Sequence, residues 1–348
     1  MIEITRGNLL ETNVEALVNT VNCVGYMGKG IALQFKKAYP DNNTAYEKAC
    51  RAKLVVPGKM FIFETGRFVN PKFIINFPTK RHYANPSRLE DIAAGLTTLI
   101  AEIRQRGIRS VAVPPLGCGL GGLDWSVVRP LIERAFAELP SVQVAMFEPV
   151  GAPDAKSMPV GTTRQELTLA RALFIKLMGQ YGELAYRLTL LEIQKLAYFL
   201  QIAGQPLKLN YEKASYGPYA KNLNKVLERM EGHYIRGYGD SQAPDVEIEL
   251  LPGADAAADI LVEANPETRP RLERVQRLIE GFETPYGMEL LASIHWVASD
   301  STAPARSAQE AIAMVHAWNH RKAAMFRPDH IAVGWKRLSS EGWIPIHN

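Results

Sequence analysis

The stretch VNTVNCVGYMGKGIA, residues 18–32, shows how the first part of the chain folds. Its apolar, β-branched start predicts a buried strand that ends in Asn-Thr-Val-Asn, passes through three glycines and enters a helix at Ile31. Glycine allows a left-handed backbone and close approach to a ligand. A helix start offers free N–H groups and the positive end of the helix dipole, which favour phosphate. The stretch therefore predicts a strand–loop–helix unit that binds a phosphorylated ligand.

The glycine spacing separates this loop from two common phosphate-binding loops. It matches neither the GxGxxG of dinucleotide-binding folds nor the GxxxxGK[ST] of P-loops. Lys29 lies between two glycines, where a P-loop lysine would open the helix. Both classes are therefore disfavoured.

A second glycine-rich loop, VPPLGCGLGGLDW, occupies residues 113–125. Again a β-branched strand passes into glycines, four of them, and then into a helix with Asp124 or Ser126 as its N-cap. Two such loops suggest two sides of one diphosphate site, although structural turns alone can also produce such a pair.

The third motif is IINFPTKRHY, residues 74–83. A strand is expected to end at Phe77, and Pro78 directs the chain that follows. Lys80 would then lie where the edge of the sheet meets the pocket. Taken alone, Lys80 is interpreted as an ordinary surface residue. The same holds for Arg81 and His82.

Strands and helices are expected to alternate through the first half of the chain. The strand candidates are Ile2–Thr5, Ala16–Val21, Met60–Phe63, Phe73–Phe77, Ser110–Pro114 and Val142–Phe147. The helix candidates are Gly30–Ala38, Thr44–Ala52, Leu89–Arg106 and Ser126–Ala137. This order predicts a three-layer α/β/α fold with a mixed, largely parallel central sheet. Ligands bind at the carboxyl ends of such strands, so the positions after Val21, Phe77 and Val113 are the candidates.

The chain is expected to divide into a first domain at residues 1–152, a proline- and glycine-rich linker at 153–162, and a second domain at 163–348. The second domain should be mostly helical, with a short β element near Val246–Leu251. Its helix candidates are Glu166–Leu177, Leu184–Ala203, Tyr219–Glu231, Pro270–Gly281, Pro285–Ser299 and Ala308–Lys322. Residues 241–268 carry seven acidic residues and neither Lys nor Arg, which is typical of a solvated acidic loop.

Composition favours a soluble protein of the cytoplasm. Apolar residues make up 47% and charged residues 22% of the 348 positions. The sequence has neither a secretory signal at its start nor a run approaching the roughly 20 apolar residues of a membrane span, so no membrane partner is expected. Its three cysteines have no metal-binding spacing and suggest a reducing compartment. Residues 1–150 hold 18 Lys and Arg against 13 Asp and Glu, a modest basic excess that fits an anionic ligand or ordinary surface solubility.

Together the three motifs resemble the macrodomain family of ADP-ribose binders and hydrolases over roughly residues 1–150. The resemblance is carried by Gly7-Asn8-Leu9, Asn19–Asn22, Gly28–Ala32 and Pro115–Gly119. The loop at 28–32 and Lys80 look most like the lysine-dependent branch, which includes eukaryotic terminal ADP-ribose glycohydrolases and bacterial antitoxins of the DNA ADP-ribosyl glycohydrolase (DarG) type. The segment Asn76–Lys80 and the helical second domain favour the bacterial type.

The resemblance implies a role for each matching position. Adenine would contact Asn8, which replaces an aspartate common in the family, and Leu9. The distal ribose would lie against Thr20, Val21 and Asn22. Thr79 would order the loop that presents Lys80, and the catalytic candidates are Lys80 and Asn22. The diphosphate would be cradled by backbone groups of Gly30, Ile31, Ala32, Leu33, Gln34, Gly117, Cys118, Gly119, Leu120 and Gly121.

One position departs from the eukaryotic lysine-dependent pattern. That branch pairs its lysine with an aspartate in the second glycine loop, where this sequence has Gly121. The group that transfers protons during hydrolysis is therefore open. Asp124 is close in sequence, but it is expected to cap the following helix.

The resemblance implies an antitoxin that removes ADP-ribose from thymine in single-stranded DNA after a partner ADP-ribosyltransferase toxin has attached it. Lys80 could attack the opened ribose as a neutral amine or donate a proton as a cation. Neither a metal nor a cofactor is expected, with ADP-ribose as ligand and product. Two alternatives remain: a hydrolase that removes ADP-ribose from protein carboxylates, and a non-catalytic ADP-ribose reader. Turnover on modified DNA, on modified protein or on neither separates them.

The second domain carries its own resemblance. The aromatic helix Leu191–Gln201, followed by Ala214–Tyr219, is similar to Panacea-type antitoxin domains. That similarity implies a toxin-binding domain. It also gives the acidic residues 241–268 a second interpretation, as a mimic of DNA phosphates that occupies a basic groove of the toxin.

Overall fold

The computed structural model describes residues 1–149, 157–183, 188–239, 246–299 and 302–344. Two compact units make up the chain: Met1–Arg164 with Gly239–Gln242, and Gln165–Tyr238 with Ala243–Asn348. None of the helices in the described ranges has the length and apolar character needed to cross a membrane.

A six-stranded sheet forms the centre of the first unit, in the order β1-β6-β5-β2-β4-β3. All neighbours pair in parallel except β3, which is antiparallel to β4. The strands are β1 Ile2–Thr5, β2 Ala16–Asn22, β3 Phe61–Glu64, β4 Phe73–Lys80, β5 Ser110–Val113 and β6 Gln143–Phe147. The sheet is thus mixed and largely parallel, as the sequence predicts.

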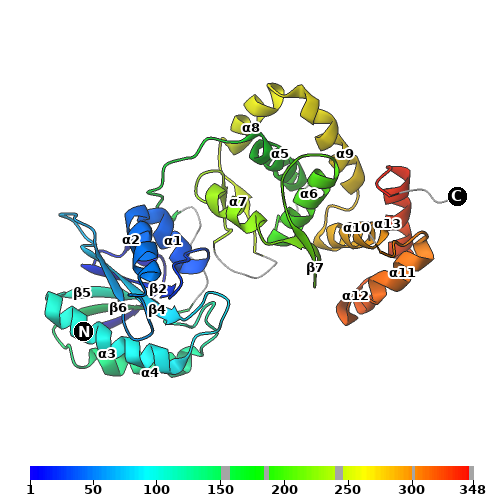
Figure 1. Ribbon diagram of the computed structural model, residues 1–348. Helices are drawn as coiled ribbons and strands as arrows, with labels where there is room; N and C mark the ends of the chain where they lie inside the picture. The colour runs from blue at the N-terminus through cyan, green and yellow to red at the C-terminus, as the bar shows by residue number, and fades with distance from the viewer. Residues whose placement is uncertain (150–156, 184–187, 240–245, 300–301, 345–348) are drawn as a thin grey trace. The chain divides into compact units, whose positions relative to one another are not determined.

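Helices cover both faces of this sheet (Figure 1). On one face, Val18, Ile75 and Val111 belong to a core shared with α3 (Leu89–Arg106) and α4 (Trp125–Phe136). On the other face, their neighbours Leu17 and Ile74 pack in a core with α1 (Gly30–Ala38). Helix α2 (Pro40–Arg51) follows α1. Successive strand residues alternate between two apolar layers, so the central strands are apolar along their length, which is typical of a buried parallel sheet.

The three sequence motifs follow three adjacent strands. Strand β2 lies between β5 and β4, and the glycine loops follow β2 and β5. Because these strands are parallel, their carboxyl ends meet at one edge of the sheet. Residues far apart in sequence are therefore assembled at a single place.

The end of β4 differs from the expectation. The strand continues past Phe77 to Lys80, so Lys80 is its last residue rather than part of a following loop. Val21 pairs with Pro78 and Asn22 pairs with Lys80, which makes Thr79 an extra residue in a β-bulge. A bulge bends the strand and re-aims the side chains beside it, and here it sets the direction of Lys80.

The second unit is mostly helical. At its centre α6 (Leu190–Ile202) is buried on nearly every side, as is α10 (Pro285–Ala298). A capping box between Thr189 and Glu192 begins α6. The other elements are α5 Leu169–Glu183, β7 Tyr211–Ala214, β8 Gly217–Ala220, α7 Leu223–Met230, β9 Ile235–Arg236, β10 Glu249–Leu250, α8 Ala254–Glu263, α9 Arg269–Ile279, α11 Ala308–His316, α12 His320–Met325 and α13 Pro328–Ser340.

Several expectations for this unit need correction. Tyr219 and Ala220 belong to the hairpin β7–β8, so the expected helix Tyr219–Glu231 is shorter. The expected helix Ala308–Lys322 is two helices, because the Asn319 side chain accepts from the Lys322 N–H and caps a new helix. Helix α13 has no counterpart among the expected elements. The expected start at Leu184 lies outside the described residues.

The acidic segment is also not simply a loop, because it contains helix α8. Asp255 and Asp259 on this helix each lie 2.8 Å from Nζ of Lys176 on α5. These two carboxylates pack α8 against α5 within the unit. Ser241 and Asp245, at the start of the segment, lie outside the described residues.

Candidate functional site

A cavity of about 730 Å³ opens at the carboxyl ends of β5, β2 and β4. That volume lies within the range of roughly 300–1,000 Å³ typical of small-molecule sites. All the predicted ligand-binding residues except Leu33 line it. Leu33 is fully buried on α1 and packs in the core instead.

The first glycine loop is held open by Asn22. The Asn22 Nδ2 donates to the Tyr26 carbonyl at 2.6 Å, and its Oδ1 accepts from the N–H groups of Val24 and Tyr26. Tyr46 on α2 donates to the Asn22 carbonyl at 2.5 Å. The amide of Asn22, a residue predicted to lie against the distal ribose, thus shapes the loop on which the cavity wall depends.

Glycines in this loop serve two different purposes. At Gly28 a Cβ would lie 2.3 Å from the Tyr26 ring, so glycine makes room for that tyrosine. Gly30 has a φ of 58°, in the left-handed region. No side chain caps α1, whose first residues Gly30, Ile31 and Ala32 line the cavity. Their end of the helix therefore presents its positive dipole to the cavity.

The second glycine loop packs on Ser87, a residue that the sequence motifs do not reveal. The Ser87 N–H donates to the Gly121 carbonyl at 2.9 Å. A Cβ at position 121 would lie 2.2 Å from Ser87 Oγ and 2.3 Å from the Gly117 carbonyl oxygen. An aspartate therefore does not fit at Gly121. As expected, Asp124 caps α4, since its Oδ1 accepts from the Ser126 N–H at 2.8 Å.

Lys80 reaches across to this second loop. Its Nζ donates to the Leu120 carbonyl at 2.5 Å and lies 3.5 Å from the Tyr83 carbonyl. Burial lowers the pKa of Lys80 below its ordinary value. Arg81, whose guanidinium makes two hydrogen bonds to Asp91 on α3, points to a different partner. Desolvation, and not the neighbouring Arg81, is therefore the cause of the lowered pKa of Lys80.

Three buried asparagines next to the site are linked by hydrogen bonds. Asn76 on β4 accepts from Asn19 on β2 at 3.0 Å and donates to Asn42 on α2 at 2.7 Å. Its amide also donates to the Phe61 carbonyl at 3.2 Å. Buried amides that hydrogen-bond one another fix the register between elements. Asn42 carries no signal in the sequence, because its partner Asn76 lies 34 residues away.

The end of the cavity away from Lys80 is formed by Asn8 and its neighbours. Asn8 Oδ1 accepts from the Leu10 N–H and caps a short 3₁₀ helix, Leu9–Glu11. Its Nδ2 donates to Ser157. Leu9, Phe147 and Met158 belong to one apolar cluster and all line the cavity. This end offers apolar contact with one polar group, which suits a purine base.

One wall residue has hydrogen-bonding capacity left. Nε2 of Gln34 is buried and has no hydrogen-bond partner among the described residues. A buried donor without a partner is costly unless a ligand or water satisfies it. Gln34 is therefore suited to bond an oxygen of a bound ligand.

Cysteine chemistry does not fit this cavity. Burial, with a smaller contribution from Asp124, raises the pKa of Cys118 to about 11. The thiol therefore stays protonated at neutral pH and is a poor nucleophile. Within the described ranges, no three His, Cys, Asp or Glu side chains are grouped to hold a metal ion.

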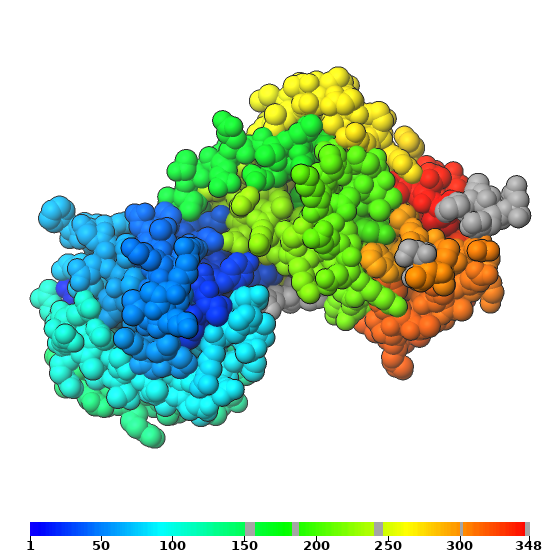
Figure 2. Space-filling view, in the orientation of Figure 1, coloured from blue at the N-terminus to red at the C-terminus, as the bar shows by residue number. Residues whose placement is uncertain are grey.

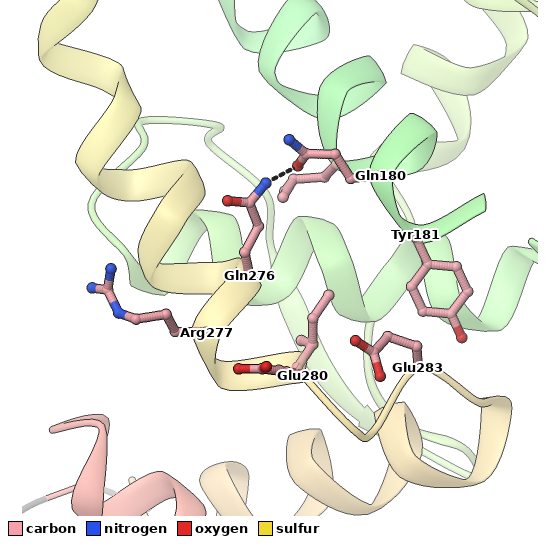
Figure 3. A pocket seen from close by; sticks show the side chains of 8 residues that line it. Gln180, Tyr181, Gln276, Arg277, Glu280 and Glu283 are labelled. Atoms are coloured by element: carbon pink, nitrogen blue, oxygen red, sulfur yellow. Dashed lines mark hydrogen bonds between the residues drawn. The ribbon is translucent and has the colours of Figure 1, made fainter. Parts of the chain in front are cut away.

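A smaller cavity of about 280 Å³ lies in the second unit (Figure 3). It is bounded by side chains of α5 and α9, where Gln276 donates to Gln180. Its polar lining is completed by Tyr181, Arg277, Glu280 and Glu283. This lining lacks the features that distinguish the larger cavity, which are glycine loops, a lysine and a helix start without a side-chain cap.

Comparison with known proteins bears on the whole chain. The Macro domain family model matches residues 18–132. A DNA ADP-ribosyl glycohydrolase of Thermus aquaticus is 46% identical over 342 residues, covering 98% of this chain and 94% of that protein. The chain belongs to the DNA ADP-ribosyl glycohydrolase family.

Two further relatives each cover 43% of this chain. A fusion protein of Thermosipho africanus, named as a DNA ADP-ribosyl transferase–DNA ADP-ribosyl glycohydrolase, is 34% identical over 164 residues, 43% of this chain and 42% of that protein. The solved macrodomain of Mycobacterium tuberculosis DarG is 57% identical, covers 43% of this chain and 99% of that chain, and gives a TM-score of 0.43.

Proposed function

We propose that this protein is the antitoxin of a toxin–antitoxin pair and hydrolyses the bond between ADP-ribose and thymidine in single-stranded DNA. One observation supports the enzymatic part above all. Lys80, set by a β-bulge at the end of β4, lies in a 730 Å³ cavity between two glycine loops in a chain of the DNA ADP-ribosyl glycohydrolase family. A substrate that carries both a diphosphate and a glycosidic bond requires a site with these features.

The proposal places ADP-ribose in the cavity in one orientation. Adenine occupies the apolar end at Asn8 and Leu9, and the diphosphate lies between the start of α1 and the loop at Gly117–Gly121. The distal ribose then lies against Thr20, Val21 and Asn22, with its anomeric carbon toward Lys80. Gln34 Nε2 supplies a donor to the diphosphate.

Lys80 acts as the nucleophile in this proposal. The neutral amine attacks the ribose carbon and displaces the thymine, which takes up the proton that the amine loses. The ribose ring then opens to give an imine with Lys80, and water hydrolyses this imine to release ADP-ribose and the free amine. Burial of Lys80 raises the neutral fraction at a given pH, because it lowers the pKa. The chemistry draws on side chains and backbone groups alone, so EDTA should leave the rate unchanged.

The test uses an ADP-ribosylated single-stranded oligonucleotide and full-length protein. Wild type should release ADP-ribose, Lys80→Ala should lose at least about 100-fold in rate, and Lys59→Ala, an exposed lysine outside the cavity, should match wild type. Activity on ADP-ribosylated protein carboxylates alone would favour the protein hydrolase. Binding of ADP-ribose without turnover on either substrate would make the protein a reader.

The second unit is proposed to bind the cognate ADP-ribosyltransferase toxin. A supporting observation is the fusion relative, whose name joins a transferase to a glycohydrolase. Among the acidic residues of segment 241–268, Glu247, Glu249, Glu263 and Glu267 are exposed, whereas Asp255 and Asp259 are paired with Lys176. Glu247 also forms a β-bridge with Thr189, so the other three are the candidates for contact with a basic groove.

Calorimetry with the toxin tests this role. Reversing Glu249, Glu263 and Glu267 to lysine should weaken binding at least about tenfold, because like charges would then face each other. Reversing Glu212, an exposed residue on β7, provides the control. Equal affinity of both variants and wild type would remove the acidic segment from the interface.

A further inference from the structure

Three aromatic side chains gather at the rim of the main cavity beside Lys80. The rings of Tyr26 and Tyr83 have their centroids 5.2 Å apart and are tilted by 58°. His82 packs on the other side of Tyr83, with centroids 4.1 Å apart and planes inclined by 33°. We call Tyr26, His82 and Tyr83 the aromatic rim.

Packing alone does not explain this cluster. Aromatic side chains in a core are buried, but Tyr83 is 49% exposed. Tyr26 and Tyr83 both line the cavity, so part of their surface faces the space where a ligand would lie. The rim is an aromatic surface at the mouth of a binding site.

Both tyrosines are positioned by the glycine loop and by β4. Asn22 bonds the backbone of Tyr26 twice, and glycine at position 28 leaves space for its ring. Tyr83 follows the end of β4 by three residues, and its carbonyl lies 3.5 Å from Lys80 Nζ. The rim is thus held at a fixed place relative to the lysine.

Its position decides which part of a substrate it can meet. In the proposed reaction Lys80 attacks the ribose carbon that carries the leaving group. That group must therefore lie at the Lys80 end of the cavity, and the rim is the surface exposed there. Adenine, at the Asn8 end, is on the opposite side.

We infer that the aromatic rim stacks the nucleobase from which ADP-ribose is removed, and that it thereby selects modified single-stranded DNA over other ADP-ribose conjugates. This inference rests on the proposed function. Aromatic rings hold nucleobases by their faces. A base is available for such contact when it is unstacked, as in a single strand. An amino-acid carboxylate would gain little from the rim, because it has no flat aromatic face to stack.

The test measures binding rather than turnover, in full-length protein with Lys80→Ala as background. Affinity is measured by fluorescence anisotropy for an ADP-ribosylated single-stranded oligonucleotide and by calorimetry for free ADP-ribose. Tyr83→Ala should weaken oligonucleotide binding by about 5- to 100-fold, the range of one lost base stack. Tyr83→Phe and Tyr83→Trp should retain it, and ADP-ribose affinity should stay within about twofold throughout.

A matched control comes from Phe68. This side chain is fully exposed in the loop between β3 and β4, which projects from the surface at the other end of β4 (Figure 2). Phe68→Ala should change neither affinity. If the rim recognises bases, an ADP-ribosylated peptide should bind equally well to the protein that retains Tyr83 and to the Tyr83→Ala variant.

Any of the following outcomes would overturn the inference. Equal loss of oligonucleotide and ADP-ribose affinity in Tyr83→Ala would mean that Tyr83 only supports the cavity. No loss in either would mean that the base lies elsewhere, and a loss for the peptide would mean that the rim reads protein conjugates. The proposed function fails separately, in the turnover assay of wild type on modified DNA, and these binding results would stand without it.

Discussion

The Nζ of Lys80 donates to the carbonyl of Leu120 at 2.5 Å, and this bond ties the end of β4 to the second glycine loop. The two residues are 40 positions apart, yet the adjacent strands β4, β2 and β5 bring them to one edge of the sheet. A lysine held by a carbonyl is oriented without being paired to a carboxylate. Its amine therefore keeps a lone pair available whenever it is neutral.

The pH profile distinguishes the two roles of Lys80. If the neutral amine attacks, kcat/KM on modified DNA should rise with pH as Lys80 loses its proton, and the rise should centre below 10.5, because burial lowers the pKa. If the cation donates a proton, the rate should fall over the same range. Trapping with borohydride provides the second readout, since only an imine between Lys80 and ribose would become a stable adduct.

Gly121 should tolerate no side chain. In Gly121→Ala the new Cβ meets Ser87 and the Gly117 carbonyl, so the second loop must shift. We expect a loss of about 1–3 kcal/mol in stability and at least about tenfold weaker ADP-ribose binding by calorimetry. Gly119→Ala is the control for stability, because a Cβ there meets no atom of the protein within 4 Å. An equal loss of stability in the two variants would contradict this account of the loop.

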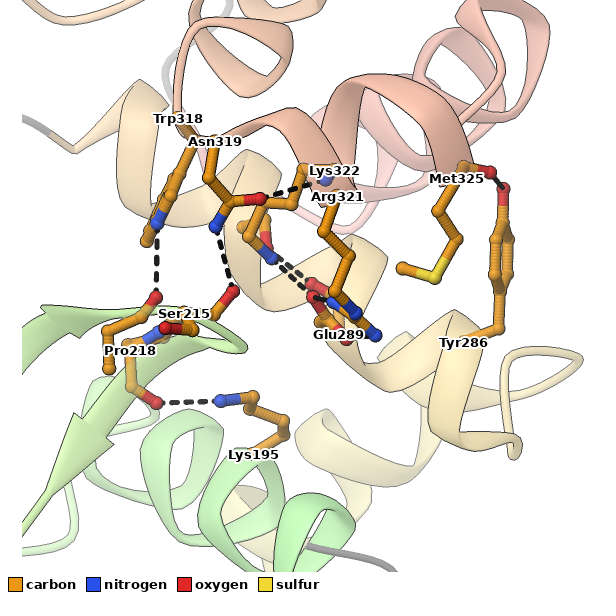
Figure 4. A network of polar contacts seen from close by, with 12 residues as sticks. Lys195, Ser215, Pro218, Tyr286, Glu289, Trp318, Asn319, Arg321, Lys322 and Met325 are labelled. Carbon is orange, nitrogen blue, oxygen red and sulfur yellow. Dashed lines mark hydrogen bonds and ion pairs between the residues drawn. The ribbon is translucent and has the colours of Figure 1, made fainter.

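A buried ionic network in the second unit should be sensitive to loss of its carboxylate (Figure 4). Glu289 accepts from Arg321 at 2.7 and 3.0 Å and from Lys322 at 2.5 Å, and both Glu289 and Lys322 are fully buried. Glu289→Gln leaves Lys322 charged without its counterion, which should cost about 3–5 kcal/mol.

Urea unfolding measured by tryptophan fluorescence tests this, because four of the five tryptophans lie in the second unit and only Trp125 lies in the first. The control is Glu212→Gln, which breaks an exposed pair with Lys221 and should change stability by less than about 1 kcal/mol. A comparable midpoint for the two variants would show that Glu289 contributes little.

His295 should make the second unit acid-sensitive. It is buried beside the hydroxyl of Tyr198 at 2.7 Å, and burial lowers its pKa to about 4 from 6.5. As pH falls through 6.5 the unfolded chain takes up a proton that the folded chain does not, so stability falls between pH 6.5 and 4, by about 3 kcal/mol in total. Burial lowers the pKa of Lys195 to about 7, so its protonation affects stability only above that pH range.

Unfolding free energies between about pH 4 and 7 check this prediction. His295→Gln should flatten the slope even where it lowers stability overall, and exposed His320→Asn should leave it unchanged. An unaltered slope in His295→Gln would assign the acid sensitivity to other groups.

The sequence predicted the first unit well because its signals are local. Apolar strands such as Ala16–Val21 and glycine loops are read from a few neighbouring residues. The bulge at Thr79 depends on the register between β2 and β4, and Ser87 depends on a contact with Gly121, so neither appears in a local pattern. The assignments of individual site residues to parts of ADP-ribose stay predictions.

The second unit was less predictable for related reasons. In α8 the apolar positions Ala254, Ala258 and Val262 follow helical spacing, but acidic residues around them resemble a solvated loop. The four-residue strands β7 and β8 are too short for alternation to stand out. Helix α8 and the hairpin β7–β8 are stabilised by partners elsewhere in the unit, namely Lys176 for α8 and Gln194 and Lys195 for β8.

The pairing of β1 with β6 has a consequence for synthesis of the protein. Residues 2–5 lie against residues 144–147, so the strand made first waits for a partner made 142 residues later. At roughly 5–20 residues per second the ribosome needs about 7–30 s for that interval. During this time the three strands that carry the glycine loops and Lys80 emerge and can pair among themselves. The edge of the sheet that holds Lys80 is thus assembled from strands inside the chain, and β1, which pairs only with β6, is added last.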